Sequence, residues 1–133
     1  MLITSPTLSF DSSAFPVEEG EDGRTNPGLF GKSLGEWLVA SLAERGVKAT
    51  GPFPEDWGWM VEVPTSPLRM GLACCSEDFE KTAWRVYGFV DLGFLDRFRR
   101  KDEANRALAE LFGTVKEILS KDPAITNLRS DES

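Results

Sequence analysis

Two runs of alternating apolar residues flank a proline-rich turn in the middle of the chain. The residues of one parity are Trp57, Trp59, Val61 and Val63 in the first run and Leu68, Met70, Leu72 and Cys74 in the second. A period of two is typical of a strand with one buried face. Pairing Val63 with Leu68 makes every cross-strand pair on that face apolar and sets Glu62 opposite Arg69. The sequence therefore predicts an antiparallel hairpin whose buried face carries both tryptophans.

Two other segments have the helical period of apolar residues. These residues are Phe30, Leu34, Trp37, Leu38 and Leu42 in the first segment and Ala104, Leu108, Leu111, Phe112, Val115, Ile118 and Leu119 in the second. We predict one helix over 28–45, with Asn26 as its cap, Pro27 at its start and Gly46 closing it. We predict another helix from a cap at Asp102 to the Asp122-Pro123 pair.

The remaining strand signals are shorter. Residues 2–10 alternate weakly, 47–50 precede a Gly51-Pro52-Phe53-Pro54 break, and 82–90 carry apolar residues on both parities. The expected fold class is α+β, with an antiparallel sheet of about four to five strands and two main helices packed on one face. A length of 133 residues predicts a single domain over 1–133, with a C-terminal tail at 124–133.

A long acidic loop is expected over 11–27. Its charged residues are Asp11, Glu18, Glu19, Glu21 and Asp22, opposed only by Arg24. The whole chain has 15 Lys and Arg against 22 Asp and Glu, a net charge of −7, whereas 97–101 is locally basic. Loops of this length are usually functional or mobile. The acidic loop therefore either steers a basic partner or acts only as a solvated segment.

The composition excludes several functions. The chain has no histidine, which removes Ser-His-Asp and Cys-His catalysis and histidine-ligated zinc. Its acidity argues against nucleic acid as a partner.

Only Cys74 and Cys75 are present, and because they are adjacent we expect reduced thiols, no metal site and a cytoplasmic location. No segment approaches a membrane span, so we expect no membrane partner. We also expect no cofactor. Gly31-Lys32-Ser33 is no phosphate loop, because Asn26 stands where its first glycine belongs.

The hexapeptide Pro54-Glu55-Asp56-Trp57-Gly58-Trp59 is the most unusual motif. Glu55 or Asp56 could act as an acid or base beside Trp57 and Trp59, or the tryptophans could anchor the core while a carboxylate holds an indole N–H. We favour the structural interpretation.

The opposite parity of the strands is partly apolar. Its residues include Gly58, Met60, Gly71, Ala73, Tyr87 and Phe89. Glycine in a strand often marks a bulge or a close approach of another group. If no further layer covers this face, it is a candidate contact surface.

Asn26-Pro27-Gly28, the segment Gly31-Lys32-Ser33-Leu34 and the hexapeptide resemble a group of small uncharacterised bacterial proteins with a PEDWGW-like motif. The resemblance implies no particular activity. In size and acidity the chain is similar to immunity proteins, which neutralise toxins, and this is an analogy of type.

We therefore expect a non-catalytic bacterial protein-binding domain, most concretely an immunity-type inhibitor of a toxin or of another basic partner protein. The candidate partner-binding residues are Glu18, Glu19, Glu21, Asp22, Glu55, Asp56, Tyr87 and Phe89. One alternative is a small-ligand module or enzyme that uses Glu55 and Asp56 with Trp57 and Trp59. The other alternative is a homodimer formed through the glycine-bearing face or an edge strand.

Overall fold

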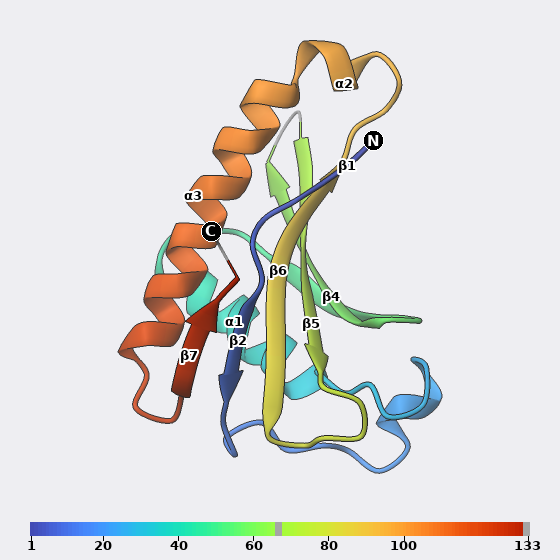
Figure 1. Cartoon of the computed structure of the whole chain (residues 1–133), viewed down its shortest axis with the longest axis vertical. Helices are drawn as coiled ribbons and strands as arrows, with labels where there is room; N and C mark the ends of the chain where they lie inside the picture. The colour runs from blue at the N-terminus through green and yellow to red at the C-terminus, as the bar shows by residue number, and fades with distance from the viewer. Residues whose placement is uncertain (66–67, 132–133) are drawn as a thin grey trace.

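A computed structural model of the chain describes residues 1–65 and 68–131. Their strands form one antiparallel sheet in the order β3-β4-β5-β6-β2-β7, with β1 paired to β6 beyond the end of β2 (Figure 1). The strands are β1 (Leu2–Thr4), β2 (Leu8–Asp11), β3 (Thr50–Glu55), β4 (Gly58–Thr65), β5 (Leu68–Ser76), β6 (Ala83–Asp91) and β7 (Thr126–Ser130). The helices are the 3-10 turn η1 (Glu21–Gly23), α1 (Lys32–Glu44), α2 (Asp96–Arg99) and α3 (Lys101–Lys121).

The two long helices, α1 and α3, cover the same face of the sheet. Val61 is paired with Leu72, and Leu72 with Gly88, across β4, β5 and β6. Gly35 of α1 lies against the Val61 side chain, and Leu108 of α3 lies against Gly88. The core between these layers is one apolar cluster to which both helices contribute. The α+β class and the antiparallel sheet are confirmed.

The sheet is larger than the four to five strands predicted, because segments with turn-like composition join its edges. The Gly51-Pro52-Phe53-Pro54 break lies inside β3, which is an edge strand and therefore tolerates residues that donate no ladder hydrogen bond. The tail is also part of the sheet, since β7 pairs with β2. The predicted strand 2–10 is split into β1 and β2, which pair with successive parts of β6.

The central hairpin is confirmed as antiparallel, but its predicted register is wrong by two residues. Met70 pairs with Val63, and Leu68 pairs with Thr65. Because the error is even, the side chains of β4 and β5 still face their predicted sides. The first strand, β4, extends through Thr65 into the expected Pro64–Pro67 turn, whereas β5 begins at Leu68, directly after it; residues 66–67 of that turn lie outside the described residues. Glu62 and Arg69 form a diagonal ion pair at 3.8 Å.

The first helix begins four residues later than predicted. Gly28 and Gly31 have φ of 85° and 155°, so the chain cannot be helical there, and Gly31 takes the capping position in place of Asn26. Gly46 closes the helix as predicted, with φ of 76°. Asp102 lies in the first turn of α3 instead of capping it, whereas the predicted end before Asp122 is confirmed.

Candidate functional site on the outer face of the sheet

The sheet face opposite α1 and α3 carries the residues that alternate with the core. Met60, Ala73 and Tyr87 form one row across β4, β5 and β6, and Glu62, Gly71 and Phe89 form the next. Met60, Tyr87 and Phe89 are each only half-buried. The two long helices pack on the other face, so these side chains remain accessible.

Four half-buried side chains gather on this face, and we call Trp57, Met60, Tyr87 and Phe89 the outer-face cluster. The ring of Phe89 stands edge-on to Trp57 at 6.0 Å between centroids and lies 6.4 Å from Tyr87. These are the distances at which aromatic pairs stabilise one another. Gly71 makes room for this arrangement, because a Cβ atom there would stand 2.5 Å from Phe89 Cζ. The glycine in the middle strand thus provides the floor on which the Phe89 ring lies.

A cleft of about 310 Å³ opens beside the cluster, with Trp57, Tyr87, Arg85 and Asp78 among its lining residues. Burial raises the pKa of the Tyr87 hydroxyl, so it is a neutral hydrogen-bonding group at pH 7. The Arg85 guanidinium is already engaged, since Nη2 donates to the Ser76 carbonyl at 3.3 Å and Nε lies 3.5 Å from a Glu77 carboxylate oxygen.

Three exposed carboxylates border this end of the face, and we call Glu55, Asp56 and Asp78 the acidic rim. None of the three forms an ion pair or side-chain hydrogen bond with another residue in 1–65 or 68–131. The two-residue turn between β3 and β4 presents Asp56, whose backbone carbonyl accepts the Asn26 N–H at 2.7 Å. This contact joins the acidic loop to the same end of the sheet, as Figure 1 shows.

The acidic loop is ordered by its own carboxylates. Glu21 is only 4% exposed, and its side chain accepts backbone N–H groups of Glu18, Gly31 and Lys32 at 3.2, 2.8 and 3.1 Å. A glycine cap offers no side-chain acceptor, so a residue ten positions earlier in the chain caps α1. Glu21 was predicted to face a partner, but it is buried in an internal role.

The other acids of the loop are divided between internal and exposed positions. The Asp22 carboxylate accepts the Gly28 N–H at 2.9 Å. Glu18 is exposed but pairs with Lys32 at 2.9 Å, a hydrogen bond that raises the pKa of that lysine. Glu19 is exposed and has no such contact with any described residue. Of the four loop acids, Glu19 alone is therefore both accessible and free of an internal role within the described residues.

The two tryptophans of the hexapeptide lie on opposite faces of the sheet, which corrects the prediction that they share one. Trp59 is 1% exposed on the helix-covered side, where the Arg24 guanidinium stands 5.3 Å from its ring. Trp57 lies in the β3–β4 turn, so strand alternation does not govern its direction, and its ring contacts Phe89 on the outer face. The two indoles cannot line one pocket together with Glu55 and Asp56.

The two cysteines are free and buried, and burial raises the pKa of both thiols. Cys75 lies beneath the cleft of the outer face. Within residues 1–65 and 68–131, no three acidic or cysteine side chains converge as metal ligands. No helix in these ranges combines the length and apolar character that crossing a bilayer requires.

Of the predicted site residues, the structure brings Tyr87 and Phe89 together and places Glu55 and Asp56 at the same end of the sheet. Trp57 is the site residue that sequence reasoning assigned to the wrong face. The sequence signal that could have placed it is the adjacent glycine, Gly58. This residue has a φ of 145°, and β4 begins there, after the turn that holds Trp57. Compared with protein-family models, with curated proteins and with solved structures, the chain matches none of them.

Proposed function

We propose that this chain is a non-catalytic protein-binding domain that holds a basic surface of a partner protein against the outer-face cluster. One observation carries the proposal: an accessible aromatic group lies over a glycine floor beside three carboxylates that pair with none of the described residues. Aromatic residues are enriched in the central part of protein interfaces and dominate their binding energy.

The geometry of the cluster suits tight contact. The rings of Trp57, Tyr87 and Phe89 already hold one another, so binding would immobilise few additional rotamers. The acidic rim favours a partner of positive charge and accelerates the encounter at low ionic strength. Salt should therefore slow association more than it changes the dissociation rate.

An immunity-type inhibitor, which neutralises a toxin by covering a basic surface, is the most concrete form of this proposal. The net charge of −7 and the absence of histidine support a binder over an enzyme. The positions of Trp57 and Trp59 on opposite faces weigh against the alternative in which both rings line a small-ligand pocket.

Affinity capture from a lysate of the native cells, followed by mass spectrometry, tests the proposal. The tagged full chain is compared with Phe89→Ala and with the matched control Phe98→Ala, which lies far from the cluster on α2. Truncating an aromatic anchor costs at least about 2 kcal/mol of binding, a loss of roughly 30-fold in affinity. Thermal unfolding of both variants confirms that each is folded.

We expect a basic protein to be captured by the parent chain and by Phe98→Ala but not by Phe89→Ala. The proposal is wrong if no protein is captured, or if Phe89→Ala captures the same protein as well as the parent. Capture of an acidic protein through the same residues would overturn the role of the acidic rim.

A further inference from the structure

A second surface lies at the opposite end of the molecule from the acidic loop, where α2 joins β6 to α3 (Figure 1). Phe94, Leu95 and Phe98 are 69%, 64% and 72% exposed there, and Met1 is next to them. We call these four residues the α2 corner. Contiguous exposed apolar side chains on a small domain mark a contact site.

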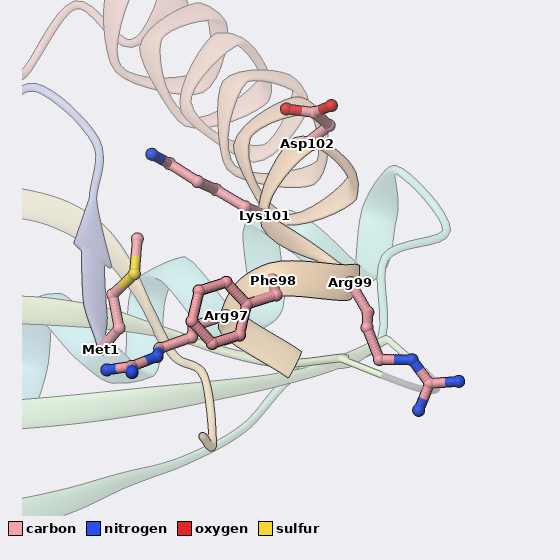
Figure 2. Close-up of a pocket in the computed structure, with 6 residues that line it drawn as sticks. All are labelled: Met1, Arg97, Phe98, Arg99, Lys101 and Asp102. Carbon is pink, nitrogen blue, oxygen red and sulfur yellow. The ribbon is translucent and has the colours of Figure 1, made fainter. Parts of the chain in front are cut away.

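The α2 corner combines a projection with a hollow. The Arg97 guanidinium lies 4.4 Å from the centre of the Phe94 ring and 4.7 Å from that of Phe98, and the rings stand edge to face. A cleft of about 520 Å³ adjoins Phe98. Figure 2 shows Arg97 and Lys101 extending towards Met1 on either side of the Phe98 ring. Arg97 already stands over both rings of its own copy, so Lys101 is the cation that the hollow offers to the aromatic rings of a second copy.

The charge of this end is balanced, unlike that of the whole chain. Residues 91–103 contain four acids and four bases, so 4 − 4 gives a net charge of zero in a chain of −7. Two copies that meet here avoid the repulsion that two acidic rims would produce. An anionic membrane, by contrast, gains no net attraction from a neutral patch on an acidic protein.

We propose that two copies of this chain associate through their α2 corners about a twofold axis, with the aromatic pair of each copy entering the hollow of the other. A twofold contact requires one surface that complements itself, and this surface carries both the projection and the hollow. The edge strand β3 is less suited to pairing between copies, because Pro52 and Pro54 lie within it.

The accessible apolar area sets the strength of this dimer. Two phenylalanines and a leucine exposed by about two thirds offer roughly 100–150 Å² each, so about 600–900 Å² is buried in total by two copies. Stable interfaces bury about 1,200–2,000 Å². The dimer is therefore weak and forms only as the protein concentration rises into the micromolar range or above.

Sedimentation velocity over a series of protein concentrations, with the full untagged chain, tests the proposal. The variants are Phe94→Ser and Phe98→Ser, with Phe79→Ser as a matched control, because Phe79 is 70% exposed on the β5–β6 loop at the other end. Circular dichroism confirms that each variant keeps its secondary structure. A third test variant, Lys101→Glu, changes the charge of the hollow without shortening any apolar side chain.

We expect the parent and Phe79→Ser to pass from monomer to dimer as concentration rises, and Phe94→Ser and Phe98→Ser to remain monomeric. Lys101→Glu should weaken the dimer at least several-fold. A parent chain that stays monomeric at the highest soluble concentration would overturn the proposal, as would a dimer that Phe94→Ser and Phe98→Ser leave intact. Flotation with anionic vesicles by a monomeric parent would assign the corner to a lipid surface instead.

Discussion

Glu21 is the residue whose removal should most clearly separate an internal acid from a partner-binding one. Its carboxylate satisfies three backbone donors, two of which belong to the N-cap and the first residue of α1. Losing a helix cap costs about 0.5–2 kcal/mol, and a hydrogen bond to a charged group contributes about 1.5–3 kcal/mol. Because these contributions overlap, we expect Glu21→Ala to lower the free energy of unfolding by about 3 kcal/mol.

The amide variant separates charge from shape. Glu21→Gln can keep one acceptor oxygen, which suits the Gly31 and Lys32 donors, but its NH₂ group then faces the Glu18 N–H. We expect this variant to lose about 1–2 kcal/mol, less than the alanine variant. Urea unfolding followed by tryptophan fluorescence gives both values, with an unchanged m-value showing that the unfolding transition is comparable.

Glu19→Ala is the control, because Glu19 is the adjacent exposed acid in the same loop. A surface substitution of this kind should change the free energy of unfolding by less than about 0.5 kcal/mol. If Glu21→Ala were as mild as Glu19→Ala, the carboxylate would not cap α1. Glu21 would then become a candidate for partner binding again, beside Glu19.

Three further outcomes follow from burial and close approach. Burial raises the pKa of both Cys74 and Cys75, so the unfolded chain loses its thiol protons at a lower pH than the folded chain. The free energy of unfolding should therefore fall as pH rises above the ordinary thiol pKa, and urea titrations at alkaline pH measure this fall. Gly31→Ala should lower the melting temperature sharply, because a Cβ atom there would clash with the Cys74 carbonyl oxygen and because the φ of this residue is 155°. Gly113→Ala, at an open position of α3, should raise the melting temperature slightly. Gly71→Ala should push the aromatic ring above it off the sheet, which near-UV circular dichroism and partner affinity would both register.

Local patterning was enough to predict the strands and helices that have a strongly apolar face. The hairpin faces, β6 and the long helix α3 all follow from periodicity, because burial on one side imposes a period of two or 3.6. The register of the hairpin did not follow, because shifts of an even number of residues keep the same faces together. Only the length of the turn decides between them, and composition alone suggested a turn that was too long.

Long-range contacts account for the remaining errors. Proline-rich β3 and polar β7 are strands because neighbouring strands offer them an edge, which no local pattern reveals. The start of α1 depends on Glu21, a residue that sequence reasoning placed in a partner-binding loop. The outer face was predicted from Tyr87 and Phe89, but Trp57 joined it only because a turn redirects its side chain.

Hydrogen–deuterium exchange of the complex with the captured protein tests the central claim most directly. Partner binding should slow exchange in the peptides that contain the β3–β4 turn and the outer-face residues of β6, at 55–60 and 85–89. Exchange in α1 and in the α2 corner should stay unchanged. Protection confined to the helices or to the α2 corner, with the outer face exchanging as in the free chain, would contradict the claim that the outer face binds the partner.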